Sequence, residues 1–286
     1  MSSELIVIVG PTASGKSRLA IRLAKKYGGE VISADSRQIY KGLEIGSGIV
    51  TKKEANGIPH HLIGIMNPKR TFSVAQYQRM AFREIHRIWK RNKLPILVGG
   101  TGLYIRAVTD GLIIPNVKPN PKFRKELEGK TVKELADTLK RKDPRRWAEI
   151  DRRNPRRLIR AIEIASALGK VPALKSEPIE AEILFLGIIK SQKEIKNAVR
   201  KRVSKMIQKG LIRETRALLK QGVNERKIRE FGFEYANTLD FIQGKIKSES
   251  ELLENIVKAT LKYAKRQMTW FKKDSRINWI KSASLI

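Results

Sequence analysis

The sequence contains no cysteine among its 286 residues. Disulfides and thiolate-bound metals are therefore excluded, and this composition fits a reducing, cytoplasmic setting. No apolar run approaches the roughly 20 residues of a membrane-spanning helix. The start, Met1-Ser2-Ser3-Glu4, also lacks the basic and apolar segments of a cleavable signal. We therefore expect a cytoplasmic protein with no membrane partner.

Acidic residues are scarce, because only 28 Asp and Glu oppose 60 Lys and Arg, which gives a formal net charge of +32. Such an excess implies a polyanionic partner, since phosphates would relieve the repulsion among the cations. Nucleic acid is the leading candidate, and an anionic membrane surface is the alternative. With 41% hydrophobic residues, the chain can bury one large core, or one core and a smaller satellite domain.

The most informative motif is a phosphate-binding loop near the N-terminus. Residues 10–17 follow the apolar run at residues 5–9 and satisfy the pattern G-x-x-x-x-G-K-[ST] between a predicted strand and a predicted helix. Glycines let consecutive N–H groups turn inward around an anion, a lysine neutralises phosphate charge, and a serine hydroxyl can ligate Mg²⁺. The alternative is a glycine turn without a ligand. The predicted phosphate-binding residues are Gly10, Pro11, Thr12, Ala13, Ser14, Gly15, Lys16 and Ser17.

Apolar runs typical of buried strands alternate with amphipathic segments along the chain. The runs lie at residues 5–9, 31–33, 94–98 and 183–189. This order predicts an α/β fold with a P-loop NTPase-like, doubly wound parallel sheet. Three prolines within residues 115–121 interrupt the pattern, and a stretch rich in Lys and Arg follows. We therefore predict a basic α-helical insertion domain at 115–181, and a catalytic core of residues 1–114 and 182–286 that ends in a long basic helix.

An acidic residue, Asp35, follows the second predicted strand and opens the stretch Asp-Ser-Arg-Gln-Ile-Tyr-Lys-Gly. Ligands of doubly wound folds bind at this edge of the sheet. Asp35 could ligate a metal or remove a proton from a nucleophile, and the alternative is a cap on the next turn. The adjacent His60 and His61 point in different directions and form a poor ligand set with His86, so we expect structural roles for them.

Together, these motifs resemble the tRNA dimethylallyltransferase family, also called tRNA isopentenyltransferases. Besides the two stretches above, the similarity rests on Gly-Ile-Pro-His-His-Leu at 57–62, Gly-Gly-Thr-Gly-Leu-Tyr at 99–104, Asn-Pro-Arg-Arg-Leu-Ile-Arg-Ala at 154–161 and Ala-Lys-Arg-Gln-Met-Thr-Trp-Phe at 264–271. The motifs occur in family order over nearly the whole chain. The lack of cysteine excludes the zinc finger that eukaryotic members often add, which favours a prokaryotic type.

The resemblance implies transfer of a dimethylallyl group from dimethylallyl diphosphate to N6 of the adenine 3′ of the anticodon in tRNA, with diphosphate as leaving group and Mg²⁺ as cofactor. It implies that residues 10–17 bind the donor diphosphate, that Arg216 lies near it, and that Ser17 holds the metal. Asp35 would be the general base, and Thr101 would orient N6 or a phosphate, unless it only forms a turn. We expect a monomer. The implied tRNA-binding residues are Asp35, Ser36, Arg37, Gln38, Arg156, Arg157 and Arg160.

The sequence departs from the family pattern at two places. Residues 47–51 read Ser-Gly-Ile-Val-Thr, where members commonly have Thr-Ala-Lys-Pro, so a lysine contact to the donor from this loop is in doubt. Glu234 stands where a basic residue is usual, which argues against a tRNA contact at this position.

Three other functions remain open. The first is a related transferase that acts on free AMP, ADP or ATP, against which the basic insertion argues. The second is an RNA-binding P-loop NTPase or nucleotide kinase, but no Asp of the Walker B type ends the run at 94–98. The third is a non-enzymatic RNA-binding module, which would leave the phosphate-binding loop and Asp35 without a role.

Overall fold

The computed structural model describes residues 3–173 and 175–281. The chain divides into two compact units: unit 1 comprises Met1–Gly111 and Pro178–Ile286, and unit 2 comprises Leu112–Glu177. Unit 2 begins three residues before the predicted insertion and ends four residues before its predicted end. A backbone bridge between Leu112 and Ser176 lies near the two ends of this unit. No helix within the described residues is long and apolar enough to cross a membrane.

Unit 1 is built on a six-stranded sheet in the order β3-β2-β4-β1-β5-β6, in which every pairing is parallel. This confirms the predicted doubly wound parallel sheet. It also adds two short edge strands, β3 and β6, that no apolar run had indicated. The strands are β1 (Glu4–Val9), β2 (Gly29–Ser33), β3 (His60–His61), β4 (Leu94–Val98), β5 (Glu182–Ile188) and β6 (Asn278–Ile280).

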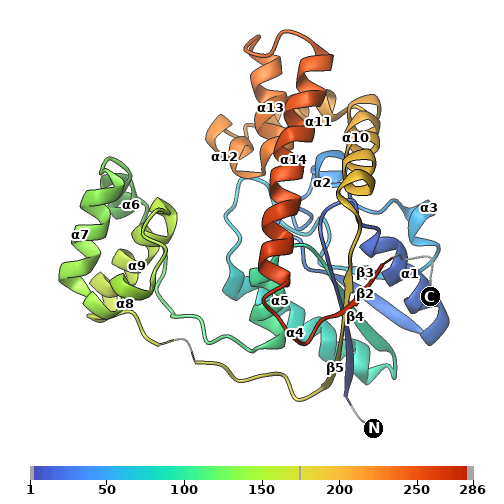
Figure 1. Ribbon diagram of the computed structural model, residues 1–286, viewed down its shortest axis with the longest axis horizontal. Helices are drawn as coiled ribbons and strands as arrows, with labels where there is room; N and C mark the ends of the chain where they lie inside the picture. The colour runs from blue at the N-terminus through green and yellow to red at the C-terminus, as the bar shows by residue number, and fades with distance from the viewer. Residues whose placement is uncertain (1–2, 174, 282–286) are drawn as a thin grey trace. The chain divides into compact units, whose positions relative to one another are not determined.

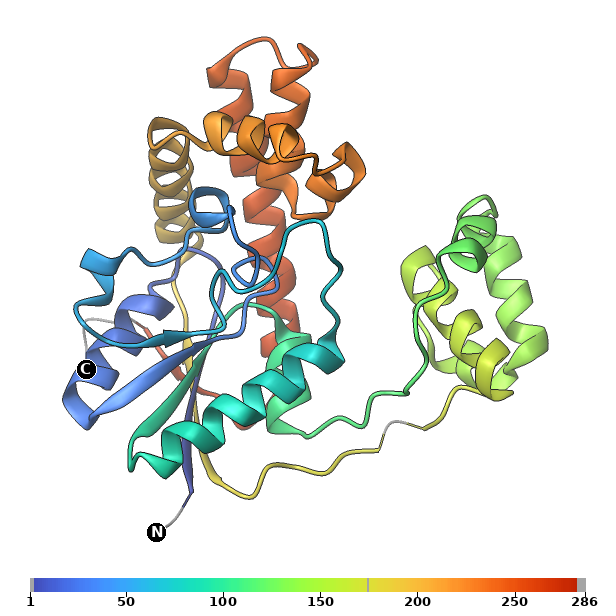
Figure 2. The ribbon, with the colours of Figure 1, turned by 180° about the vertical axis from the view of Figure 1, so that it is seen from behind.

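Helices cover both faces of the sheet, because alternate residues of each buried strand point to opposite sides. Ile6 and Ile8 of β1 pack in one cluster with residues of α1 (Lys16–Tyr27). Leu5 and Val7 pack in a second cluster with residues of α4 (Val74–Lys90) and α5 (Gly102–Thr109), which Figure 2 shows on that face. The carboxyl ends of the strands are thus held between two apolar layers.

A group of helices extends the second cluster beyond the sheet (Figure 1). Its longest member, α14, begins after the capping residue Ser248 and runs through the predicted basic helix to Phe271. Val199, Val203 and Met206 lie on the buried face of α10. The helices are α10 (Gln192–Gln208), α11 (Leu211–Lys220), α12 (Glu225–Glu230), α13 (Phe233–Ile242) and α14 (Glu249–Phe271), with the short α2 (Glu44–Ser47) and α3 (Lys52–Ala55) in the loop after β2.

Unit 2 contains four helices and has a core of its own. Each helix starts at a side chain that accepts a backbone N–H: Asn120, Thr131, Asp143 and Asn154. Such caps satisfy N–H groups that a helix start leaves free. The helices are α6 (Pro121–Glu128), α7 (Val132–Lys142), α8 (Pro144–Glu149) and α9 (Pro155–Leu168).

Candidate active site

The loop at residues 10–17 joins β1 to α1 with the backbone of an anion cradle. Gly10 and Gly15 have φ angles of 143° and 104°, in the region that favours glycine, and Ala13 has a φ of 60°. A Cβ atom on Gly10 would lie 2.9 Å from the carbonyl oxygen of Ile188, so the close approach to β5 also requires glycine. The Ser14 hydroxyl is buried and has no hydrogen-bond partner among the described residues. The loop therefore holds a polar group that a bound anion could satisfy.

Lys16 occupies the first position of α1, and its Nζ donates a hydrogen bond to the Pro11 carbonyl oxygen at 2.7 Å. Burial and the nearby Arg202 guanidinium lower the pKa of Lys16 to about 7, against the opposing effect of the Asp35 carboxylate. Near pH 7, Lys16 is therefore only partly charged while the cradle holds no anion. An anion in the cradle would stabilise the charged form of Lys16.

Asp35 and Thr101 come from loops that follow neighbouring strands, β2 and β4. The Thr101 hydroxyl accepts a hydrogen bond from the Ser36 N–H at 3.2 Å, and the Thr101 N–H donates to the Ala34 carbonyl oxygen at 3.2 Å. Asp35 Oδ1 accepts from the Arg37 N–H at 2.9 Å, so Asp35 stabilises the turn that follows it while remaining partly exposed. The structure therefore brings these two predicted residues together at the carboxyl edge of the sheet.

Arg202 of α10, which the sequence did not single out, carries a charge that acts on Lys16 of the cradle. The position of Arg216 near the donor stays a prediction. Arg202 donates from Nη2 to the Ser47 carbonyl oxygen at 3.1 Å, and its charge acts on Lys16. Burial lowers the pKa of Arg202, while Glu234 and Asp35 raise it. Arg216 lies on an exposed part of α11. Sequence reasoning missed Arg202 because nothing in the local pattern of α10 distinguishes it from its basic neighbours.

The first departure from the family pattern has a structural explanation at Arg202. A Cβ atom on Gly48, whose φ angle is 64°, would lie 2.3 Å from Arg202 Nη2, so a larger residue there would require this guanidinium to move. Gln38 binds the same loop, because its Nε2 donates to the Ser47 and Gly48 carbonyl oxygens at 3.4 Å each. The Gln38 Oε1 accepts from the Ser33 hydroxyl at 2.8 Å. Gln38 therefore connects the end of β2 to the segment that receives Arg202.

Gln267 of α14 is a second residue that sequence reasoning did not single out, although it lies within the motif at 264–271. Its Oε1 accepts from the Thr12 N–H at 2.8 Å, and its Nε2 donates to the Gly100 carbonyl oxygen at 2.9 Å. The side chain is buried. Gln267 thus joins the phosphate-binding loop to the loop that carries Thr101.

The predicted tRNA-binding arginines of unit 2 differ in their surroundings. Arg156 and Arg157 are exposed at the start of α9, with Arg157 at 3.6 Å from Asp151. Arg160 instead pairs with the buried Glu163 and donates to the Val117 carbonyl oxygen at 3.0 Å. Arg160 therefore stabilises unit 2, which sets it apart from the other two.

The adjacent histidines make structural contacts. The Nδ1 atom of His60 lies 2.8 Å from the Ile58 carbonyl oxygen, and the Nε2 atom of His61 lies 2.7 Å from Oε2 of Glu30. Glu30 also pairs with Arg91 and Lys93 at 2.7 and 3.0 Å. Among residues 3–173 and 175–281, no group of three or more His, Cys, Asp and Glu side chains could hold a metal ion.

Comparison with known proteins agrees with this geometry. The family described as IPP transferase matches residues 38–274. A tRNA dimethylallyltransferase of Carboxydothermus hydrogenoformans is 40% identical, with 99% of this chain and 93% of that protein covered. The crystal structure of a tRNA isopentenylpyrophosphate transferase from Bacillus halodurans is 35% identical, with a TM-score of 0.73 and coverage of 98% and 90%.

A second solved structure is a eukaryotic dimethylallyltransferase acting on tRNA. It is 26% identical, with a TM-score of 0.83, and the match covers 99% of this chain and 74% of that protein. The family match and the nearly full-length relatives lead to one conclusion. The chain belongs to the IPP transferase family, whose relatives named here are tRNA dimethylallyltransferases.

Proposed function

We propose that this chain transfers the dimethylallyl group from dimethylallyl diphosphate to N6 of the adenine 3′ of the anticodon in tRNA. The observation that carries the proposal is the convergence at one sheet edge of an anion cradle (residues 10–17), two cations (Lys16 and Arg202) and a carboxylate (Asp35). A phosphate-binding loop supplies what a diphosphate leaving group needs, and a nearby carboxylate supplies what an attacking amine needs.

In the proposed reaction, the N6 atom attacks the allylic carbon of the donor while the carbon–oxygen bond to diphosphate breaks. The electron pair of that bond leaves with diphosphate, where the loop N–H groups, Lys16 and Arg202 stabilise the added negative charge. Asp35 accepts the proton that N6 loses, and Thr101 holds the loop that carries Asp35 in place. Positioning matters because an exocyclic adenine amine is a poor nucleophile.

The proposed cofactor is Mg²⁺, which Ser17 would hold and which would supply positive charge to the donor diphosphate when bound. The residues fit this ion: Ser17 lies in the first turn of α1 beside the cradle, and Ser14 offers a buried hydroxyl without a partner. Magnesium at such sites takes few protein ligands and several phosphate or water oxygens. The lack of an acidic cluster among the described residues is therefore compatible with Ser17 as the protein ligand.

The proposed tRNA-binding groups are Ser36, Arg37 and Gln38 of unit 1, and Arg156 and Arg157 of unit 2. The two exposed arginines of α9 belong to a unit dense in Lys and Arg, as expected for contacts with phosphates. Arg160 stays a further proposed tRNA-binding residue, and it also pairs with Glu163. We propose a cytoplasmic monomer in which unit 2 contributes to tRNA binding.

The test is a transfer assay on the wild-type protein. Purified protein and Mg²⁺ are incubated with radiolabelled dimethylallyl diphosphate and either unmodified tRNA or AMP, while ATP hydrolysis is followed separately. Label at the adenine next to the anticodon supports the proposal. Label only in the free nucleotide would indicate a nucleotide prenyltransferase, and ATP hydrolysis without transfer would refute the proposed roles of the loop and Asp35.

A further inference from the structure

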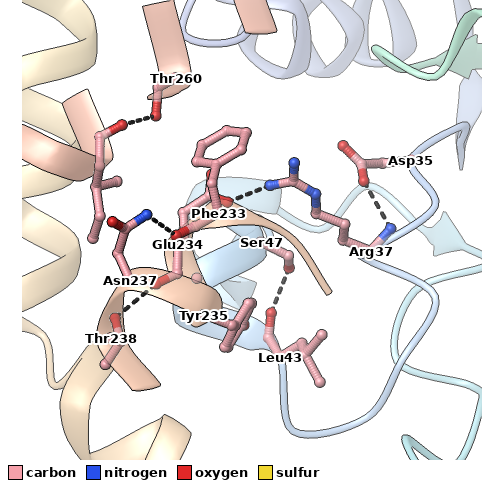
Figure 3. Close-up of polar contacts among 12 residues, drawn as sticks. Asp35, Arg37, Leu43, Ser47, Phe233, Glu234, Tyr235, Asn237, Thr238 and Thr260 are labelled. Atoms are coloured by element: carbon pink, nitrogen blue, oxygen red, sulfur yellow. Dashed lines mark hydrogen bonds and ion pairs between the residues drawn. The ribbon is translucent and has the colours of Figure 1, made fainter. Parts of the chain in front are cut away.

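The Arg37 guanidinium, which extends from the turn after β2, is held by side chains of α13 and α14. Figure 3 shows it beside Phe233 and Glu234 of α13. Its Nη1 atom makes an ion pair with Glu234 of α13. The guanidinium carbon lies 4.6 Å from the ring centre of Phe233 and 5.3 Å from that of Tyr263. Planar guanidinium groups stack well on aromatic rings, so these contacts hold the group in one orientation.

The backbone at Gly232 makes room for this arrangement. A Cβ atom there would lie 2.6 Å from the guanidinium carbon of Arg37, and the φ angle of Gly232 is 122°. The segment from Gly232 to Glu234 therefore supplies space, an aromatic face and a counter-charge in consecutive residues. Three features that converge on one side chain indicate that its position matters.

The Glu234 carboxylate sets the charge around Arg37. The side chains of Arg37 and Glu234 are only 18% and 8% exposed, so the two charges compensate each other with little help from water. A buried charge without a partner would be strongly unfavourable. Glu234 and Asp35 both act on the Arg37 charge, and Arg202 also acts on Glu234. The two carboxylates therefore offset the positive charge of Arg37, which weakens its attraction for a phosphate.

The remaining N–H groups of Arg37 can still form directed hydrogen bonds. An arginine has five donors in a planar fork, and the pair with Glu234 uses Nη1. Asp35, the proposed base at N6, accepts from the backbone N–H of Arg37 at 2.9 Å, so the two residues belong to one turn. Single-stranded RNA is recognised by bases that stack on aromatic or guanidinium planes and bond along their edges. An unstacked base near Asp35 suits these donors better than a phosphate does.

We propose that Glu234 is a positioning residue: it fixes the Arg37 guanidinium and neutralises its charge, so that Arg37 contacts a base of the anticodon loop rather than a phosphate. This inference rests on the proposed function, because it requires tRNA as the acceptor. It assigns a role to the acidic departure at position 234, for which the sequence indicated no contact with tRNA.

The experiment compares Glu234→Gln, Arg37→Met and the double variant with the wild-type protein. Glu254→Gln is the matched control, because it also removes one negative charge and breaks an arginine pair, with Arg200, that is exposed. For each protein we would measure tRNA affinity over a range of salt concentrations, kcat and KM for both substrates, and the melting temperature.

The expected results separate the two kinds of contact. Arg37→Met lowers kcat/KM for tRNA by about tenfold, as for the loss of one base contact, and leaves the slope of log affinity against log salt unchanged. Glu234→Gln lowers kcat/KM for tRNA to a similar degree and steepens that slope by about 0.7, as for one more cation facing a single strand. Neither single variant weakens donor affinity. The kcat/KM for tRNA of the double variant is no lower than that of Arg37→Met, and Glu254→Gln behaves as the wild type.

Three results would overturn the inference. A slope that flattens by about 0.7 in Arg37→Met would mean that Arg37 contacts a phosphate. If Glu234→Gln kept the kcat/KM for tRNA of the wild-type protein, Glu234 would not position the Arg37 guanidinium. A joint loss of donor affinity, tRNA affinity and melting temperature in Glu234→Gln would show that the pair only supports the fold. If the wild-type protein fails to prenylate tRNA, the proposed function fails first, and that result is separate from the slopes.

Discussion

Replacing Gln267 by leucine would remove the link between the phosphate-binding loop and the loop that carries Thr101. The Thr12 N–H would lose an acceptor at 2.8 Å, and the Gly100 carbonyl oxygen would lose a donor at 2.9 Å. Leucine has a similar volume but no polar atoms, so both backbone groups would be left without this partner. We expect the variant to fold, with the phosphate-binding loop no longer held against Gly100.

The size of the effect follows from these two bonds. Each hydrogen bond contributes about 1 kcal/mol net, and more when the abandoned partner stays buried, so the free energy of unfolding should fall by about 2–4 kcal/mol. Donor affinity should fall by about 10–100-fold, since small displacements of a binding group have effects of this size. Binding of tRNA should change little, because Gln267 is buried and cannot reach the solvent-exposed RNA.

The assay is the KM for dimethylallyl diphosphate together with urea unfolding. Thr269→Ala is the control, because Thr269 lies two residues after Gln267 on an exposed part of α14, and this variant should behave as the wild type. Gly100→Ala should reproduce the donor defect, because a Cβ atom there would lie 2.2 Å from Gln267 Nε2. Reduced stability with an unchanged donor KM in Gln267→Leu would refute the positioning role.

Three further predictions concern single side chains. Lys16→Ala should weaken donor binding at least tenfold and leave tRNA affinity nearly unchanged, as measured by equilibrium binding of each substrate; equal losses would argue against the cradle. Arg156→Glu should flatten the salt dependence of tRNA affinity, with Arg160→Gln lowering stability instead; an unchanged slope for Arg156→Glu would place the tRNA surface elsewhere. Glu30→Gln should lower the free energy of unfolding by about 2 kcal/mol at pH 7. This loss is smaller than the free energy that corresponds to the full pKa shift of Glu30, because Arg91 and Lys93 are half exposed and water screens their pairs with Glu30. Hydrogen bonds from Lys93, His61 and Arg91 outweigh the effect of burial and lower the pKa of Glu30 from 4.5 to about 2, so this contribution is complete above pH 4.5 and declines as the pH falls toward 2. Urea unfolding of the wild type and of Glu30→Gln at pH 7 and pH 3 measures this contribution. The stability difference between the two proteins should be smaller at pH 3, and an equal difference at both pH values would contradict the prediction.

Local patterns in the sequence predicted the sheet and the cradle, because both depend on residues close together in the chain. The loop at 10–17 carries its glycines, lysine and serine in one run, and the buried strands appear as apolar segments. Strands β3 and β6 were missed, since two and three partly exposed residues form no apolar run. The boundaries of unit 2 also differ from the prediction, because a backbone bridge near its ends leaves no compositional trace.

Contacts between distant segments could not be predicted from the sequence. Arg202 reaches Ser47 across 155 positions, and the Thr12 N–H meets Gln267 across 255. A list of charges also does not say which charges are already paired. Arg160, which is predicted to bind tRNA, also pairs with Glu163. Glu234, which is predicted to make no tRNA contact, pairs with Arg37. Both stay predictions.

The most direct test of the account is the effect of Asp35→Asn on the chemical step. Asparagine keeps the size of the side chain and an oxygen that can accept from the Arg37 N–H, but it cannot take the N6 proton. In single-turnover transfer of labelled dimethylallyl to tRNA, we predict a rate at least about 10²-fold below that of the wild type, with tRNA and donor affinities unchanged. A wild-type rate would contradict the assignment of Asp35 as the base and, with it, the central claim that this sheet edge carries out the transfer.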